Sequence, residues 1–262
     1  MNEEIITTIN ELKKEFERIS KKGYIKGIYN SLSSIGRTFE NELNLPMNKE
    51  CVPDYYGIEI KTRRTYSKSA ITLFTAVPDG EEPLEIERLK NTYGYPYKKD
   101  KNYKCLYVDV YGNKLTFGGM KYQYKLDFDK KNEKVYLCVC NRQGILLERK
   151  AYWTFKYLED KLLTKLSYLA IVNVWPTEKQ GWNYFKYYKI TFFKLKGFTS
   201  FIKLLENGII KLTLKIDIYT DEDNYGKTYD HGCGFSNQEK DVVKLFDKIE
   251  NKKISLCNSK NK

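Results

Sequence analysis

Histidine is the residue that this sequence most nearly lacks, because His231 is the only one among 262 residues. No site can therefore contain two imidazoles, and we do not expect His231 to be a catalytic base. The chain also lacks any window approaching about 18 uninterrupted apolar residues, which excludes a conventional membrane-spanning helix. Its start, MNEEIITTINELKKEF, is acidic and amphipathic, unlike a secretory signal. We expect a cytoplasmic protein with no membrane partner.

Cysteine is present, but not in the spacing of a zinc site. None of the six cysteines forms a C-x-x-C pair. Cys138 and Cys140 alternate within a strand-like run and would face the same side, yet one C-x-C without a second pair is weak evidence for zinc. The interpretation that remains is reduced thiols in the core or at the surface.

Basic residues exceed acidic ones by a wide margin. Lys and Arg total 46 against 34 Asp and Glu, which gives a formal charge of +12 and an isoelectric point near 9.1. Such a chain attracts polyanions, so nucleic acid is the natural partner and an anionic membrane surface the second. A lysine-rich composition that serves only solubility explains the charge equally well. The hydrophobic fraction of 41% excludes a disordered chain.

The periodicity of apolar residues predicts an α/β protein. Ile5, Ile9, Leu12 and Phe16 recur at helical spacing within a helix over residues 3–21. A second helix is predicted over 35–43, followed by strands over 57–65 and 70–76 and, from residue 104, by strands separated by Gly-Asn and Gly-Gly turns. The length fits one large domain or two lobes that share a core.

Residues 52–64, VPDYYGIEIKTRR, carry the chemistry. Strand alternation points Glu59, Lys61 and Arg63 to one face and Ile58 and Ile60 to the other. The pattern P-D-x4-E-x-K places Asp54 where it can share a divalent cation with Glu59 through oxygen ligands, as Mg²⁺ prefers. Lys61 can then orient a water or neutralise charge at a phosphate, which is the chemistry of phosphodiester hydrolysis. A half-exposed strand with ordinary charges explains the pattern alone equally simply.

Five sequence blocks, taken in order, resemble the MvaI/BcnI restriction endonucleases, which are relatives of the mismatch-repair enzyme MutH within the PD-(D/E)xK nuclease superfamily. The blocks are IGRTFE (35–40), PDYYGIEIKTR (53–63), SKSAITLFT (67–75), FxxLLENGII (201–210) and DHGCGF (230–235). They span most of the chain and are far more specific than the short motif. The resemblance implies a restriction-endonuclease-like mixed β-sheet flanked by helices, with two lobes that form a DNA-binding cleft.

The resemblance also implies catalytic roles. Asp54 and Glu59 are the expected Mg²⁺ ligands, Lys61 assists the nucleophilic water, and Glu40 is an accessory acid near the metal. The products implied are 5′-phosphate and 3′-hydroxyl ends. The alternative for Glu40 is an ordinary solvated glutamate of the helix with no catalytic role.

The DNA contacts are less well defined, because no arginine follows Arg149. Bidentate reading of guanine by a guanidinium is therefore excluded from the C-terminal part, although related enzymes carry arginines there. His231, in the block that lies on the recognition side in the family, is expected to read a base edge or contact a phosphate. The remaining candidates for DNA contact are Arg63, Lys68, Asn224, Lys227, Tyr229, Asn237 and Gln238.

These inferences predict a monomeric type II restriction endonuclease that cleaves a specific double-stranded DNA sequence with Mg²⁺. Residues 1–150 would form the catalytic lobe and residues 151–262 the DNA-recognition lobe, with a DNA methyltransferase as genetic partner. One alternative is a MutH-like enzyme that nicks one strand in DNA repair. The other is a DNA-binding module without catalysis, against which the intact Asp54, Glu59 and Lys61 argue.

Overall fold

The chain divides into two units, each assembled from several segments. The computed structural model describes residues 3–46, 52–79 and 85–253. Unit 1 comprises Met1–Ser69, Thr164–Lys196 and Phe246–Lys262, and unit 2 comprises Ala70–Leu163 and Gly197–Leu245. The expected division at residue 150 therefore does not coincide with the units, because the chain returns to unit 1 after Leu163 and again after Leu245.

Unit 1 is built on a five-stranded mixed sheet with the order β1–β12–β11–β2, in which β16 also pairs with β12. The pair β2 and β11 is parallel, and the other pairs are antiparallel. The strands are β1 (Ile25–Lys26), β2 (Ile58–Arg64), β11 (Tyr168–Lys179), β12 (Trp182–Leu195) and β16 (Phe246–Lys253). The helical elements are α1 (Glu3–Lys21), η1 (Leu32–Ser34) and α2 (Ile35–Glu42), so both helices predicted for this part of the chain are confirmed.

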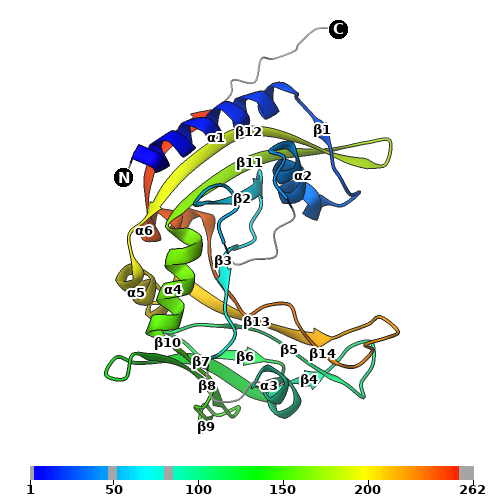
Figure 1. The fold of residues 1–262 in the computed structure, drawn as a ribbon. Coiled ribbons are helices and arrows are strands. Elements are labelled where there is room, and N and C mark those ends of the chain that lie inside the picture. Colours follow the sequence, from blue (N-terminus) through cyan, green and yellow to red (C-terminus); the bar gives the residue numbers. More distant parts are fainter. Residues whose placement is uncertain (1–2, 47–51, 80–84, 254–262) are drawn as a thin grey trace. The chain divides into compact units, whose positions relative to one another are not determined.

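The core of unit 1 lies between these two helices and one face of the sheet (Figure 1). The apolar stripe of α1, including Leu12 and Phe16, packs with Ile58 and Ile60 of β2. Gly36 allows α2 to approach β2, because a Cβ at this position would lie 3.3 Å from Thr62 Oγ1. One face of β2 is therefore committed to the core, and Glu59, Lys61 and Arg63 are left on the other.

Unit 2 contains two sheets. The six-stranded sheet has the order β3–β15–β13–β5–β4, with β14 paired to β13, and the five-stranded sheet has the order β10–β8–β7–β6, with β9 paired to β8. The first consists of β3 (Ile71–Thr75), β4 (Tyr95–Pro96), β5 (Lys104–Val110), β13 (Ile210–Ile218), β14 (Thr228–Asp230) and β15 (Gly234–Asn237). The second consists of β6 (Thr116–Gly118), β7 (Tyr122–Asp129), β8 (Lys134–Cys140), β9 (Leu146–Glu148) and β10 (Tyr152–Thr154). The helical elements are α3 (Glu85–Tyr93), α4 (Phe155–Leu166), α5 (Phe198–Glu206), η2 (Glu239–Asp241) and α6 (Val242–Leu245).

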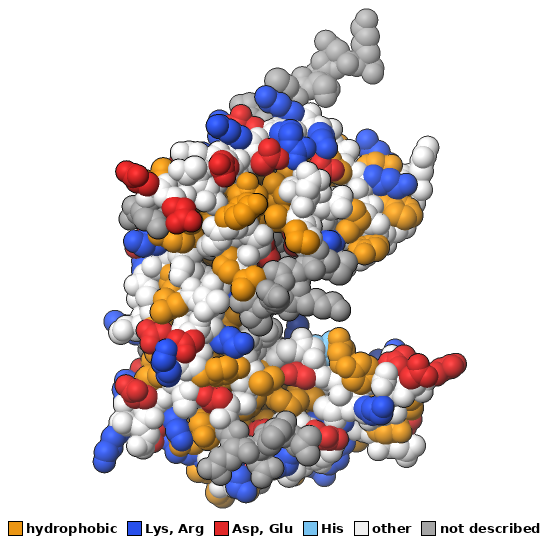
Figure 2. Space-filling view, in the orientation of Figure 1, with side chains coloured by type: hydrophobic (Ala, Val, Ile, Leu, Met, Phe, Trp, Pro, Cys, Tyr) orange, Lys and Arg blue, Asp and Glu red, His pale blue; other side chains and the backbone are white. Residues whose placement is uncertain are grey.

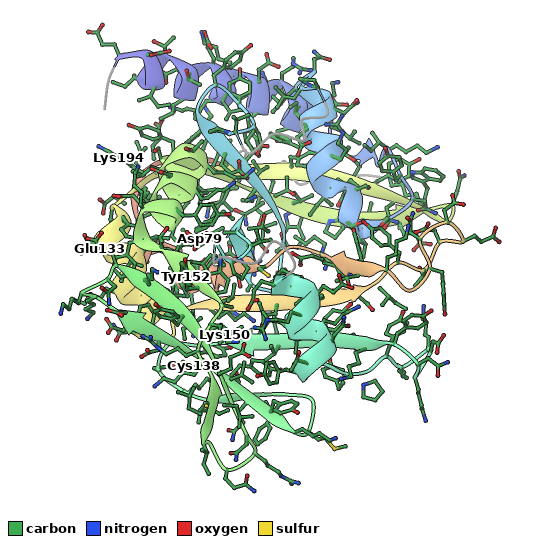
Figure 3. All side chains as sticks on the ribbon, turned by 60° about the horizontal axis from the view of Figure 1, so that its bottom comes forward. Asp79, Glu133, Cys138, Lys150, Tyr152 and Lys194 are labelled. Carbon is green, nitrogen blue, oxygen red and sulfur yellow. The ribbon has the colours of Figure 1, made fainter. Side chains whose placement is uncertain are left out.

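Asp79 fixes the start of α4 (Figure 3). Its carboxylate accepts hydrogen bonds from the backbone N–H of Thr154, at 2.9 Å, and from the Thr154 hydroxyl, at 2.5 Å. The buried indole of Trp153 donates to the carbonyl of Ala76 at 3.0 Å. These bonds tie the segment after β3 to β10 and so set where α4 begins, which matters because the last turn of α4 belongs to unit 1.

The four described cysteines are free and buried. Burial raises the pKa of the Cys138 thiol to about 11, so this thiol stays protonated at neutral pH. Cys138 lies on β8 of the five-stranded sheet, as Figure 3 shows. These thiols match the reduced state expected from the spacing, and Cys51 and Cys257 lie outside the described residues. Among the described residues, no helix is both long and apolar enough to span a membrane.

Replacing Phe16 by Ala should lower the free energy of unfolding by about 3 to 5 kcal/mol, because its fully buried ring leaves a cavity between α1 and the sheet. Urea denaturation followed by circular dichroism measures the change. The matched control is Ile6→Ala on the exposed side of the same helix, where 41% exposure predicts less than about 1 kcal/mol. Equal losses in the two variants would contradict this account of the core.

Candidate active site

A tight turn explains the four residues between the two acidic positions of the motif. Tyr55 and Ile58 exchange backbone hydrogen bonds of 3.0 and 2.8 Å across Tyr56 and Gly57, which both have positive φ. This turn folds the chain back on itself, so that Asp54 Oδ2 accepts a hydrogen bond of 2.8 Å from the backbone N–H of Ile60. Asp54 is thereby fixed beside the strand that carries Glu59.

Glu59 is the electrostatic centre of the site. Its side chain is only 1% exposed, and its Oε1 accepts a hydrogen bond of 2.6 Å from Lys61 Nζ. Lys165, in the last turn of α4, places its Nζ 3.6 Å from Oε2. Burial raises the pKa of the Glu59 carboxyl, the charge of Lys61 opposes this shift, and the nearby carboxylate of Asp54 adds to it. Two ammonium groups thus face one buried carboxylate.

The donor atoms fit a divalent cation. Glu59 Oε2 is buried and has no hydrogen-bond partner within the described residues, although a buried carboxylate oxygen is normally satisfied. Asp54 lies near enough for its charge to act on Glu59. Two carboxylates with room for water are the set that Mg²⁺ prefers. No group of three or more His, Cys, Asp or Glu side chains suited to a metal occurs among the described residues.

Lys165 is the member of this site that sequence reasoning missed. It follows Lys61 by more than a hundred positions and stands in an ordinary amphipathic helix. The only local signal was its place three residues before the apolar strand that begins at Tyr168. Its approach to Glu59 arises because β11 pairs in parallel with β2, with Leu169 opposite Glu59.

Glu40 occupies a different environment. Its carboxylate pairs with Arg37 one turn earlier in α2, with Nη1 and Oε2 3.1 Å apart. Its Oε1 lies 3.8 Å from the Cβ position of Gly36, on the side of β2 where Thr62 meets α2. Glu59 points to the opposite face of the strand, so the structure groups Asp54, Glu59 and Lys61 more closely than it groups Glu40 with them. The accessory role of Glu40 stays a prediction.

The two basic residues expected to contact phosphate near β2 differ in exposure. Arg63 is 6% exposed, and its Nη2 donates a hydrogen bond of 2.8 Å to the carbonyl of Ser67. It holds the turn after the catalytic strand in this conformation. Lys68, in the same turn, is exposed. Contact with DNA remains a prediction for both.

In unit 2, the segment around His231 forms a polar and aromatic cluster. His231 Nε2 lies 3.5 Å from Tyr107 Oη and 3.9 Å from Asp217 Oδ2, and Tyr107 donates to Asp217. The ring of Tyr229 meets the imidazole edge to face at 4.4 Å between centroids. Lys227 is exposed and donates to Asn224 Oδ1 at 3.0 Å. Tyr107 on β5 and Asp217 on β13 orient the imidazole, and no local pattern in the sequence indicates these two contacts.

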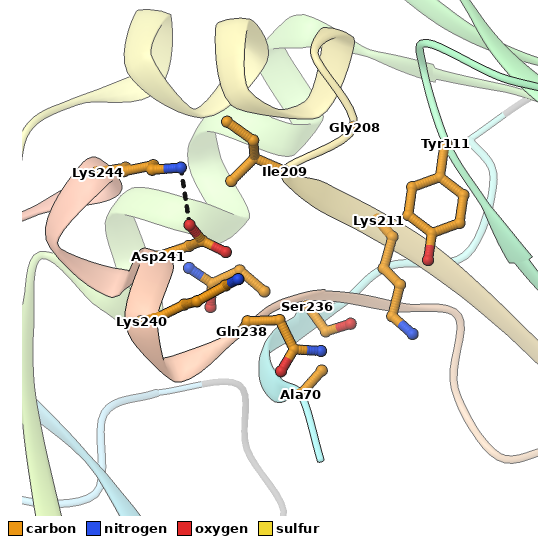
Figure 4. A pocket seen from close by; sticks show the side chains of 11 residues that line it. Ala70, Tyr111, Gly208, Ile209, Lys211, Ser236, Gln238, Lys240, Asp241 and Lys244 are labelled. Carbon is orange, nitrogen blue, oxygen red and sulfur yellow. Dashed lines mark ion pairs between the residues drawn. The ribbon is translucent and has the colours of Figure 1, made fainter. Parts of the chain in front are cut away.

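Asn237 and Gln238 line a pocket of about 300 Å³ in unit 2 (Figure 4). Asn237 is 1% exposed, and neither atom of its amide has a hydrogen-bond partner in the described part of the chain. Gln238 is exposed. Lys211, Lys240 and Lys244 share the pocket, and Lys244 pairs with Asp241 at 2.8 Å. The Asn237 amide is thus buried in a pocket lined by lysines, and DNA contact by Asn237 or Gln238 stays a prediction.

The family of the chain follows from comparison with known proteins. The model of the MvaI/BcnI restriction endonuclease family matches residues 13–246. The chain belongs to this family. It is similar to the solved restriction endonuclease MvaI–cognate DNA substrate complex, with a TM-score of 0.85 and 30% identity over 97% of this chain and 100% of that one. It is also similar to the restriction endonuclease MvaI in the absence of DNA, with a TM-score of 0.60 and 27% identity over 95% and 98%. A search of curated proteins finds no match.

Membership of the MvaI/BcnI family identifies the chain as a type II restriction endonuclease, a site-specific endodeoxyribonuclease that binds DNA. Restriction endonucleases of this kind generally use a divalent metal ion. The resemblance, fold class and enzyme class predicted from the sequence are therefore confirmed.

The raised pKa of Glu59 predicts a pH dependence of stability. The folded chain binds this proton more tightly than the unfolded chain does, so this residue lowers the free energy of unfolding as the pH rises from the ordinary value of 4.5 through the raised one. Glu59→Gln should abolish this contribution and be the more stable form at pH 7. Urea denaturation of both proteins at pH 4.5 and pH 7 measures the difference. The prediction would be contradicted if the difference in free energy of unfolding between Glu59→Gln and wild type did not increase from pH 4.5 to pH 7.

Proposed function

We propose that the enzyme hydrolyses DNA with Mg²⁺ held by Asp54 and Glu59, and leaves 5′-phosphate and 3′-hydroxyl ends. The observation that carries this proposal is the buried Glu59 Oε2, which has no hydrogen-bond donor among the described residues, in a carboxylate close enough to Asp54 to feel its charge. When bound, the cation supplies Lewis acidity that activates a water and offsets the negative charge that develops on the phosphate.

The residues of the chain then have distinct roles. The backbone N–H of Ile60 holds the Asp54 carboxylate in place, which reduces the reorganisation needed for binding. The charge of Lys61 lowers the pKa of the Glu59 carboxyl against the larger effect of burial, and its ammonium group has further N–H donors for the nucleophilic water or the scissile phosphate. Lys165 supplies a second positive charge at Oε2. Glu40 is the candidate accessory acid, if Arg37 releases it.

We assign DNA reading to unit 2. His231 and Tyr229 are candidates to contact bases or phosphates, with Tyr107 and Asp217 as orienting neighbours. Lys227, Asn237 and Gln238 are further candidates, and Arg63 and Lys68 are candidates on unit 1. Because no arginine follows Arg149, the target sequence does not carry over from a relative.

We further propose that the enzyme is a cytoplasmic monomer. One active site then cuts one strand at a time, and double-strand cleavage takes two sequential nicks with reorientation between them. A DNA methyltransferase would protect the host at the same sequence. A MutH-like nicking enzyme that depends on a recruiting protein is the second candidate, and cleavage of both strands of naked plasmid by the purified chain separates the two.

Asp54→Asn and Lys61→Ala should each lower the rate of plasmid cleavage about a hundredfold or more, because each removes a charge that acts on the transition state. Binding to duplex DNA with Ca²⁺ in place of Mg²⁺ should stay nearly unchanged. Gel analysis of cleavage and fluorescence anisotropy measure the two quantities. Glu4→Gln, at an exposed carboxylate of α1, is the matched control. Wild-type rates in either site variant would remove that residue from the mechanism.

His231→Ala should weaken or relax the choice of cleavage site while the purified protein keeps its fold. The reason is that the imidazole is held by Tyr107 and Tyr229 at the end of β14, with 40% of its side chain exposed to a ligand. Sequencing the ends of a digested plasmid gives the sites, and anisotropy gives the affinity. Unchanged fragment patterns together with unchanged affinity would rule out a recognition role.

A further inference from the structure

The catalytic face of the unit 1 sheet is the face that carries Glu59, Lys61 and Arg63. It extends beyond these residues. Each residue of β2 on this face has a neighbour on β11: Glu59 pairs with Leu169, Lys61 with Ile171, and Arg63 with Asn173. The next position of β11 on the same face is Trp175. Leu169 and Ile171 are buried, whereas Asn173 and Trp175 are partly exposed. The face therefore opens toward solvent as it leaves Glu59.

A β-bulge turns an extra aromatic residue onto this face. On β12, Lys189 pairs with Asn173 and Tyr187 pairs with Val174, so Tyr188 is the additional residue between them. Tyr187 and Ile190 on either side point into the core. Tyr188 and Lys189 consequently share the opposite face, and the Tyr188 ring lies 5.4 Å from the Trp175 ring. Bulges of this kind commonly re-aim side chains next to active sites.

Tyr66 completes the cluster in an unusual conformation. It follows the catalytic strand with φ of +64°, a region that side chains other than Gly, Asn and Asp seldom adopt. Its ring meets Trp175 edge to face at 5.4 Å, yet the residue is 86% exposed. The side chain thus accepts conformational strain without contributing much burial, which points to a role outside the fold. Thr65 anchors the turn through hydrogen bonds to Val174 and Tyr188.

The charge on this face favours an anionic polymer. Lys189 pairs with Asn173 and Lys186 with Trp175, so both lysines lie on β12 next to the strand positions of the aromatic cluster. Neither lysine has an ion-pair partner within the part of the chain that the structure describes. Farther along the hairpin, Lys186 and Lys179 lie over the ring of Tyr24, at 5.9 and 5.3 Å. Aromatic rings interleaved with unpaired lysines are typical of surfaces that contact nucleic acid.

The helix-covered side of unit 1 is different. Several of its basic residues are paired with acids, as in Arg18 with Glu15 at 2.7 Å and Lys22 with Glu42 at 2.6 Å. Figure 2 shows acidic and basic side chains mixed over α1.

We propose that Tyr66, Trp175 and Tyr188, with Lys186 and Lys189, form a flank-binding surface that contacts duplex DNA outside the cleaved phosphate. The exposed Tyr66 ring packs on a sugar or base, and the lysines neutralise adjacent phosphates. Trp175 lies four residues beyond Ile171, the partner of Lys61, which is about 13 Å along the strand. That distance corresponds to about four nucleotides. This inference rests on the proposed cleavage at Asp54, Glu59 and Lys61.

The test combines Tyr66→Asn with DNA length. Asn tolerates positive φ, so the variant removes the ring without adding strain. Affinity is measured by anisotropy with Ca²⁺, for a long duplex centred on the mapped cut and for duplexes shortened from one end at a time. We expect Tyr66→Asn to bind the long duplex about tenfold more weakly than wild type does. For a duplex that ends within about four nucleotides of the cut, we expect the variant and wild type to bind with equal affinity. Tyr66→Phe should restore the affinity.

Two further variants sharpen the result. Tyr29→Asn, at a residue that is 57% exposed in the same unit, should leave affinity unchanged. Lys189→Ala should lower the slope of log affinity against log salt concentration by about one. Loss of affinity by Tyr66→Asn that is the same for long and short duplexes, or a change below twofold on both, would overturn the inference. Cleavage by wild type is scored first, because its failure would refute the proposed function, whereas intact cleavage with no effect at Tyr66 refutes only the flank-binding surface.

Discussion

The buried carboxylate of Glu59 is the constraint on which the rest of the catalytic unit depends. A carboxylate taken out of water is unstable unless positive charge compensates it, and Lys61 and Lys165 supply that charge from a strand and a helix far apart in the sequence. Lys61 lies two residues from Glu59 on the same strand, and the parallel pairing of β2 with β11 brings Lys165 to the same carboxylate. A metal cation that took over part of the charge compensation from these lysines would bind at a carboxylate from which the fold already excludes water.

The same sheet separates stability from chemistry by the alternation of its strands. Ile58 and Ile60 face α1 and α2, whose apolar residues fix the position of the strand, and Glu59 and Lys61 face away from them. The core residues of the strand therefore fix the positions of Glu59 and Lys61, while the core itself contributes no group to the chemistry. The bulge at Tyr188 departs from this alternation, because it adds one aromatic residue to the catalytic face while Tyr187 and Ile190 still point into the core.

Under the proposed assignment of DNA reading to unit 2, recognition depends on side chains other than arginine. His231 is held among Tyr107, Tyr229 and Asp217, and the amide of Asn237, which lines a pocket with three lysines, has no hydrogen-bond partner among the described residues. Polar groups that are oriented before DNA arrives lose less entropy on binding than flexible lysines do. These oriented groups are consistent with the lack of arginine in the C-terminal part of the chain.

The sequence by itself determined the two helices of unit 1, the strand that carries Glu59 and Lys61, the family and the enzyme class. Those features are local: helical spacing places Leu12 and Phe16 on one stripe, and strand alternation separates Glu59 from Ile60. Only the tertiary structure decided that Lys165 meets Glu59, that Asn237 is buried, and that each unit is assembled from several segments of the chain. Each of these depends on strand pairing between segments distant in the chain, and pairing register leaves no mark on local composition or periodicity.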